Sequence, residues 1–126
     1  MRIKIYNEIH LDSEMEVFQE EHEVDYVTKG EDSYLIYQND EKEKVILKFR
    51  QGELQMTRYS TPKTVMRFLE KEEAIVVLPT PMGLQHLITK TDKLEQKEGR
   101  IELAYHLKPL DSDQIFASYE MTIVWE

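Results

Sequence analysis

Two arginines occupy positions at which a predicted β-strand should carry an apolar side chain. Arg58 continues the alternation of Leu54 and Met56, and Arg67 alternates in phase with Val65. An arginine that faces a core needs an internal carboxylate or a ligand anion, because burying an unpaired charge is very costly. Beside apolar side chains, such a cation would suit the anionic head group of a small amphipathic molecule. The alternative is an arginine at a barrel mouth, with its stem packed and its guanidinium in water.

The face of Arg58 follows from the turn at Gln51 and Gly52. If these two residues form a hairpin loop, Arg58 lies opposite Val45. Directly opposed residues share a face of the sheet. The other face of this hairpin is polar and is expected to be wet, since it carries Lys44, Lys48, Arg50, Glu53 and Gln55. Arg58 is therefore predicted on the core face.

Counting outward from a turn to the opposed residues also assigns faces to Arg67 and His86. A hairpin that turns at residues 71–72 would place Arg67 opposite Val76, on the same face of the sheet. A second hairpin, turning over residues 79–83, would add His86 to that face. The sequence thus predicts two arginines and one histidine among apolar side chains.

A tyrosine on an inward face would complete such a site, because its hydroxyl can donate a hydrogen bond to a carboxylate. Tyr105 lies on the apolar face of residues 101–107, and Tyr119 lies on the last predicted strand. The predicted ligand-binding residues are Arg58, Arg67, His86 and Tyr105.

Alternating apolar and polar residues predict a chain made of β-strands. Residues 3–11 alternate with a period of two, although Asn7 sits in the apolar phase. Residues 14–28 are predicted as one long, bent strand, with a short helix as the alternative. Gly99 marks either a turn between two strands or a bulge in one. The last strand is predicted over residues 115–125.

The spacing of these strands indicates the architecture. Roughly nine or ten short strands recur at about 8–12 residues, which is typical of sandwiches and of up-and-down barrels. Local hairpins favour the barrel. The length of 126 residues suits one domain, so residues 1–126 are predicted to form a single antiparallel barrel of about 8–10 strands. A barrel of about eight strands can hold one small ligand.

Composition limits the partners and the compartment. The net charge of −9, from 25 acidic and 16 basic residues, disfavours binding to a phosphate backbone. The acidic residues cluster mainly beside predicted turns, as expected of a solvated surface. The N-terminal residues lack the apolar segment of a signal peptide, and no apolar run approaches the roughly 20 residues that span a bilayer. A cytoplasmic protein without nucleic-acid or membrane partners is predicted.

Several kinds of chemistry have no signature in the chain. The absence of cysteine removes disulfides, thiol nucleophiles and thiolate zinc sites. The four histidines, which are His10, His22, His86 and His106, show none of the short spacings of a zinc motif. Phosphate-loop, dinucleotide and nucleophile-elbow fingerprints are also missing. No metal site, cofactor or catalytic residue is predicted.

Four segments carry a resemblance to a known family. They are LQMTR at residues 54–58, VMRFLE at 65–70, LPTPMGL at 78–84 and GRIELAY at 99–105. Together they resemble the YwiB-like family of small bacterial proteins of unknown function, best over residues 45–107. The turn at 80–83 resembles the family's Thr-Pro-aromatic-Gly turn, from which Met82 departs. The resemblance implies a calycin-type, lipocalin-like barrel, and it brings no established activity or catalytic residue.

Three hypotheses of function follow. The first is the binding of a small amphipathic or anionic ligand inside the barrel. The second is a homodimer, because both faces of the strands at 65–69 and 74–78 are largely apolar. The third is a small lyase or hydrolase, which rests only on analogy with calycin-type enzymes such as the phenolic acid decarboxylases.

Overall fold

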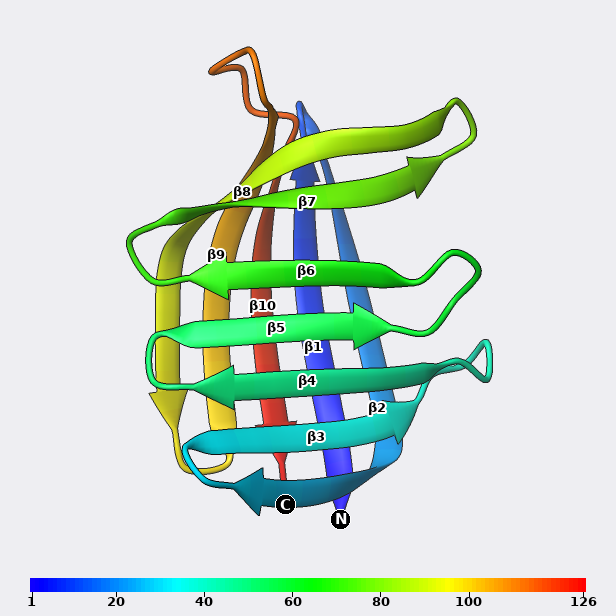
Figure 1. Cartoon of the computed structure of the whole chain (residues 1–126), viewed down its shortest axis with the longest axis vertical. Coiled ribbons are helices and arrows are strands. Elements are labelled where there is room, and N and C mark those ends of the chain that lie inside the picture. The colour runs from blue at the N-terminus through cyan, green and yellow to red at the C-terminus, as the bar shows by residue number, and fades with distance from the viewer.

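In the computed structural model, residues 1–126 are described, except for the side chain of Thr80. The described residues form ten β-strands and no helix, as predicted (Figure 1). The strands are β1 (Arg2–Leu11), β2 (Glu14–Lys29), β3 (Asp32–Gln38), β4 (Lys44–Arg50), β5 (Glu53–Arg58), β6 (Thr64–Leu69), β7 (Glu73–Thr80), β8 (Gly83–Lys97), β9 (Arg100–Pro109) and β10 (Ala117–Trp125).

All ten strands belong to one antiparallel sheet, in the order β6-β5-β4-β3-β2-β1-β10-β9-β8-β7. Figure 1 shows β3–β7 lying across β1 and β8–β10, so that the sheet folds back on itself as a nearly closed barrel. This confirms the antiparallel barrel predicted from the strand pattern and is consistent with the calycin-like barrel that the family resemblance implies. Within the described sheet, β1 with β10 is the one pair that joins strands distant in the sequence.

Two long strands form the corners between the layers. The first half of β2 pairs with β1 as far as Glu23, and its second half pairs with β3 from Val24 onward. In β8, the ladder with β9 shifts between Thr91 and Lys93. The long strand predicted at residues 14–28 is thus confirmed and the helical alternative is wrong, because β1 pairs along this segment from Leu11 back to Arg2.

The barrel closes between β6 and β7 without a backbone ladder, because these two strands are the edges of the sheet. At the corner, the Glu72 amide donates to the Leu69 carbonyl at 3.1 Å. Further along, the Thr89 hydroxyl of β8 lies 2.8 Å from the Arg67 carbonyl oxygen and 3.3 Å from that of Ala74. The Thr89 side chain therefore bridges the two edges of the sheet.

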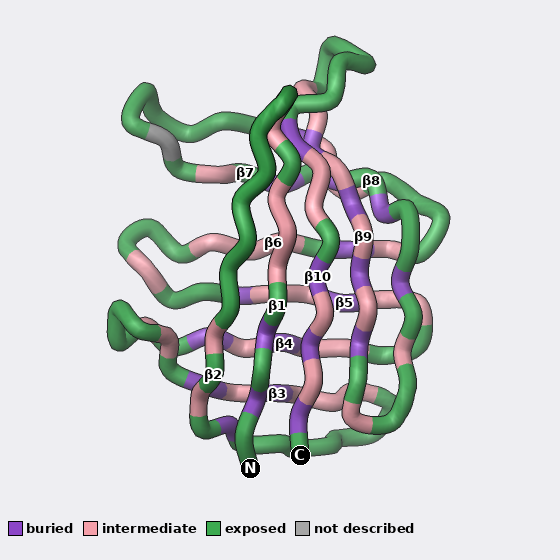
Figure 2. Tube along the Cα trace, turned by 180° about the vertical axis from the view of Figure 1, so that it is seen from behind, coloured by how far each residue is buried: buried purple, intermediate pink, exposed green. Residues whose placement is uncertain are grey.

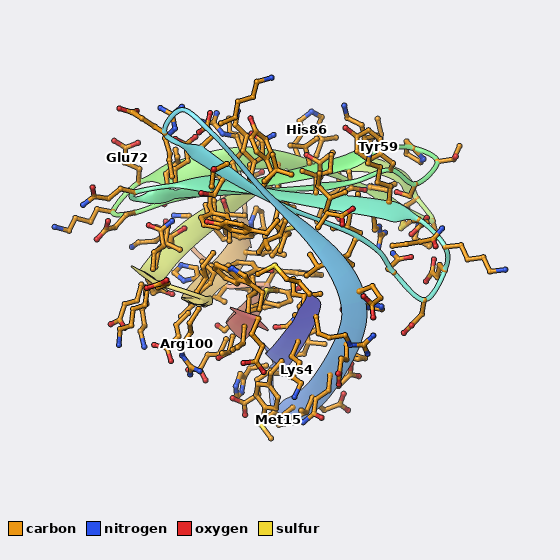
Figure 3. The ribbon with its side chains drawn as sticks, turned by 90° about the horizontal axis from the view of Figure 1, so that it is seen from below. Lys4, Met15, Tyr59, Glu72, His86 and Arg100 are labelled. Carbon is orange, nitrogen blue, oxygen red and sulfur yellow. The ribbon has the colours of Figure 1, made fainter. Side chains whose placement is uncertain are left out.

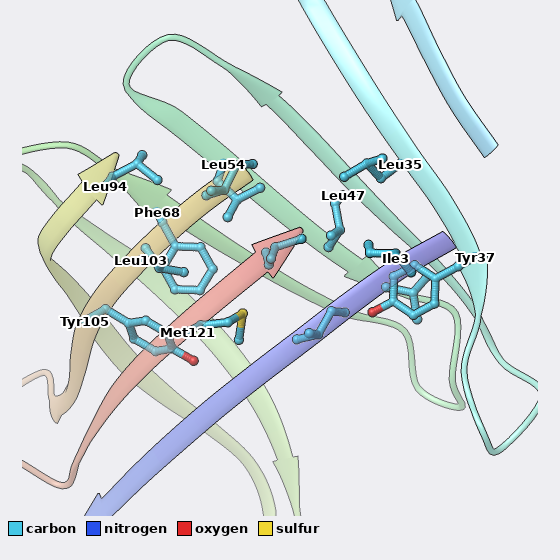
Figure 4. Packing of buried hydrophobic residues seen from close by; sticks show 14 of the residues in the cluster. Ile3, Leu35, Tyr37, Leu47, Leu54, Phe68, Leu94, Leu103, Tyr105 and Met121 are labelled. Carbon is cyan, nitrogen blue, oxygen red and sulfur yellow. The ribbon is translucent and has the colours of Figure 1, made fainter. Parts of the chain in front are cut away.

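The core fills the barrel along most of its length. Buried and more exposed residues alternate along β9, along the start of β1 and along the end of β10 (Figure 2), as expected of strands with one inward face. Phe68 is fully buried, and its ring lies 4.4 Å from that of Tyr105 (Figure 4). The Tyr105 ring in turn stacks on that of Tyr119 at 4.6 Å. Other buried members include Ile3, Leu35, Leu47, Leu54, Ile101, Leu103 and Ile123.

Several local predictions can be compared with the observed strand bounds and pairing. The turn at Gln51 and Gly52 is confirmed, since Val45 lies opposite Arg58. Gly99 lies in the turn between β8 and β9, so the bulge alternative is wrong. The last strand begins at Ala117, two residues later than predicted. The predicted hairpin that pairs residues 65–69 with 74–78 does not form, because β6 pairs with β5 and β7 pairs with β8.

Candidate functional site

A pocket of about 570 Å³ opens at one end of the barrel. Its walls come from β1–β7 and β10 and from the turn between β3 and β4. The inner part is apolar, formed by Ile5, Phe18, Val45, Met56, Met66, Leu78 and Met121. The polar part consists of Asn7, Glu20, Tyr37, Asn39, Asp40, Glu41, Thr57, Arg58 and Thr64. Such a concave, largely apolar site with a few polar groups is typical of small-molecule binding.

Two polar atoms in this pocket are buried without a hydrogen-bond partner. They are Oδ1 of Asn7 on β1 and Oγ1 of Thr64 at the start of β6. Buried polar atoms are normally paired, because an unmade hydrogen bond costs roughly 1–3 kcal/mol. Asn7 occupies an inward position of β1, which its place in the apolar phase of the sequence already indicated. Both atoms belong to residues that line the pocket, and neither has a partner within the described chain.

Arg58 lies at the rim of the pocket, on the predicted face. It is the last residue of β5, and its side chain is 50% exposed. Its Nε lies 3.7 Å from the Glu43 carboxylate, which is an incomplete ion pair. The arginine thus packs its stem beside the pocket and keeps its guanidinium in water, which is the alternative considered for a barrel mouth.

Tyr37 also lines the pocket, and Val45 of β4 lies between it and Arg58 in the register. Its side chain is 9% exposed and its ring stacks on that of His22 at 5.2 Å with an interplanar angle of 12°. Burial raises the pKa of the Tyr37 hydroxyl, and the negative charge of Glu20 raises it further, while Arg58 acts in the opposite sense. The hydroxyl therefore stays protonated and can donate a hydrogen bond in the pocket.

The sequence predicts that Arg67 faces the barrel interior, but it faces outward. It lies opposite Gln55 on β5, and its guanidinium points outward to Glu53, with Nη2 3.0 Å from Oε1. The prediction assumed that β6 pairs with β7. Because β6 is an edge strand and pairs only with β5, inward positions of β6 are Met66 and Phe68 instead.

His86 is exposed on the outer side of the β7–β8 hairpin, opposite Val77 (Figure 3). The prediction required Leu78 opposite Leu84, whereas Pro79 lies opposite Leu84. The turn is shorter than assumed, and a shift of one residue exchanges the two faces of a strand. The structure thus separates His86 from the other predicted ligand residues.

Tyr105 is buried as predicted, but it belongs to the packed core and not to the pocket wall. Burial between Phe68 and Tyr119 raises the pKa of its hydroxyl, with a smaller contribution from Tyr119. Of the four predicted ligand-binding residues, the pocket therefore contains Arg58 alone.

The fold and the pocket define a class of protein: a small, nearly closed antiparallel β-barrel of ten strands with an open pocket at one end. Residues 3–123 match the family described as a domain of unknown function, DUF1934, and the chain belongs to that family. Among the described residues, no helix is long and apolar enough to cross a membrane.

A solved structure supports the same relationship. The crystal structure of ywiB protein from Bacillus subtilis is similar to this chain with a TM-score of 0.75 and 23% sequence identity, and the match covers 99% of this chain and 90% of that one. The YwiB-like resemblance found in the sequence is confirmed. At this identity the likeness shows the fold alone. The search of curated proteins found no match.

Proposed function

We propose that the protein binds a small amphipathic molecule in the pocket at the open end of the barrel. The observation that carries this proposal is a pocket of about 570 Å³ whose wall holds two buried polar atoms without partners, Asn7 Oδ1 and Thr64 Oγ1. The apolar part of the ligand would pack against side chains such as Met66 and Met121, and its polar end would satisfy these atoms.

The charges at the rim favour one kind of polar end. Glu20, Asp40 and Glu41 line the pocket, and Arg58 is the one cationic side chain among its lining residues. Because Arg67 and His86 lie elsewhere, the negative charges outnumber the positive ones. A neutral or cationic head group that donates hydrogen bonds is therefore favoured over an anionic one, since Asn7 Oδ1 can only accept.

Three molecules with the same tail test this proposal: decylamine, decanol and decanoate. Binding is measured by calorimetry and by native mass spectrometry. We expect the amine or the alcohol to bind to the pocket with a stoichiometry of one and more tightly than decanoate. Absence of binding by all three, or tightest binding by decanoate, would count against the proposal.

A pair of matched variants locates the site. Thr64→Val removes the unpaired hydroxyl in the pocket and should weaken binding of the best probe by about fivefold to tenfold, which corresponds to one neutral hydrogen bond. Thr91→Val removes another buried, unpaired hydroxyl that lies outside the pocket and should leave binding unchanged. Equal effects of the two substitutions would place the ligand elsewhere.

A homodimer is a second candidate, favoured by the outer face of the β7–β8 hairpin. Ile75 and Leu84 are each 65% exposed there, and Val77 lies between them in the register. An apolar face of this kind can pair with its own copy about a twofold axis. Sedimentation of the wild type and of Leu84→Glu at high concentration tests it. A dimer dissociated by the substitution is expected, and a strictly monomeric wild type would refute it.

A further inference from the structure

Three side chains with metal-ligand chemistry converge beside the pocket. Glu20 and His22 are two residues apart on β2, so they project from the same face of the strand. Asp40 comes from the turn between β3 and β4. One ligand atom from each of the three residues lies within 4.8 Å of the others. Glu20 and Asp40 also line the pocket, so the cluster is open to its interior.

The imidazole is held in place before any ion binds. The His22 side chain is 10% exposed, and its ring stacks on the buried ring of Tyr37. Its Nε2 lies 3.1 Å from Oε1 of Glu20. Ligand atoms bound at adjacent positions on a metal lie about 3 Å apart, given bonds near 2.1 Å. A small movement of the carboxylate would therefore let both residues bind one ion.

The surroundings hold an excess of negative charge and a hydroxyl without a partner among the described residues. Glu20, Asp40 and Glu41 line the pocket, and Glu43 beside Arg58 adds a fourth carboxylate. Arg58 is the one cationic side chain among the lining residues. Independently, the hydroxyl of Tyr37, a residue that is nine-tenths buried and lines the same pocket, forms no hydrogen bond within the described part of the chain (Figure 4). An ion with its bound water would neutralise the charge and offer the hydroxyl a partner.

We propose that Glu20, His22 and Asp40 bind a divalent transition-metal ion at the mouth of the pocket. One imidazole with two carboxylates suits Zn²⁺ or Mn²⁺ better than Mg²⁺, which prefers an octahedral shell of oxygens. Three protein ligands leave at least one position for water or for the polar end of a pocket ligand. The inference goes beyond the proposed function, because the ion site exists without an amphipathic ligand.

A second group of possible metal ligands in the same chain can be compared with the first. Glu8, His10 and Glu120 form a second group of one histidine and two carboxylates, again with ligand atoms within 4.8 Å of one another. His10 is exposed, however, and none of the three lines the pocket that holds the first group. A fixed and partly enclosed group should bind an ion more tightly than this open one, because less freedom is lost on binding.

Calorimetric titration with ZnCl2, after removal of metal with a chelator, tests the proposal on the full chain. We expect one tight site in the wild type. His22→Gln and Asp40→Asn should each weaken it by at least about tenfold, as even outer-shell partners of a metal do when they are replaced. His10→Gln should leave the affinity unchanged, and titration with MgCl2 should show far weaker binding. Asp40 lies in an exposed turn, so its variant remains informative if His22→Gln fails to fold.

Three results would overturn the proposal: no heat of Zn²⁺ binding, an Asp40→Asn variant that binds as tightly as the wild type, or a loss of affinity in His10→Gln as large as in His22→Gln. The amphiphile titrations are run in the presence of chelator. Failure of the metal site and failure of the proposed ligand binding are therefore observed separately.

Discussion

Replacement of Thr89 by valine should loosen the closure of the barrel. Thr89 is fully buried, and its hydroxyl approaches the carbonyl oxygens of Arg67 on β6 and Ala74 on β7. Valine keeps the shape of the side chain but removes the hydrogen-bond donor. We expect a loss of about 1–3 kcal/mol of unfolding free energy, because a carbonyl that loses its partner inside the protein bears much of its desolvation penalty.

Urea denaturation measures this loss. With a slope of about 1–3 kcal/mol per molar for a small protein, the midpoint should fall by on the order of 1 M. Amide hydrogen exchange should also accelerate in β6 and β7, the two edges that the hydroxyl bridges, more than in β9 or β10. These local and global measurements together distinguish an opened seam from a general loss of stability.

Thr91→Val is the matched control, on the same strand. Thr91 is also buried, but its hydroxyl has no partner. The same substitution there removes an unpaired polar group from the interior and should be neutral or stabilising. Equal midpoints for Thr89→Val and Thr91→Val would refute the idea that the Thr89 hydroxyl holds the two edges together.

Two further predictions concern the core and the surface. Phe68→Ala should cost about 3–5 kcal/mol in urea denaturation, because Phe68 is fully buried, whereas Phe116→Ala, at a residue that is 55% exposed, should change stability by about 0.5 kcal/mol or less. Hydrogen bonds from Arg100 and Lys93 lower the pKa of Glu102 from 4.5 to about 2. Because this pKa is lower in the folded state, the stabilisation by Glu102 is present above pH 4.5 and is lost as pH falls towards 2. The difference in urea midpoint between wild type and Glu102→Gln should therefore shrink over that range.

The sequence predicts faces correctly where a short turn determines the register. Gln51 and Gly52 form the expected loop, and Gly52 adopts the positive φ of 79° that such a loop requires. Arg58 therefore lies opposite Val45 as predicted. The same reasoning fails for Arg67, because it assumes that consecutive strands pair. The packing of the closed barrel, and not the local turn, decides that β6 and β7 stay unpaired at its seam.

The pocket residues show a second limit of prediction from the sequence. Asn7 could be found from the sequence, since a polar residue interrupts an apolar phase there. The convergence of His22 with Asp40 could not be found in this way, because β2 must bend at Val24 before the next turn reaches it. Ligand motifs are recognised by short spacings along the chain, and this group is brought together by a corner of the sheet.

The pairing of β1 with β10 has a consequence for how the barrel assembles. Across the described strands, the other ladders join neighbours in the sequence and can form as separate hairpins or meanders. The β1–β10 ladder instead closes a loop of more than a hundred residues, from Ile3 beside Trp125 to His10 beside Ser118. Folding thus divides into two arms, β1–β6 and β7–β10, with low contact order within each arm. We expect the union of the two arms to be the slow, entropically costly step. Substitutions in this ladder should then slow folding more than equally destabilising ones inside either arm.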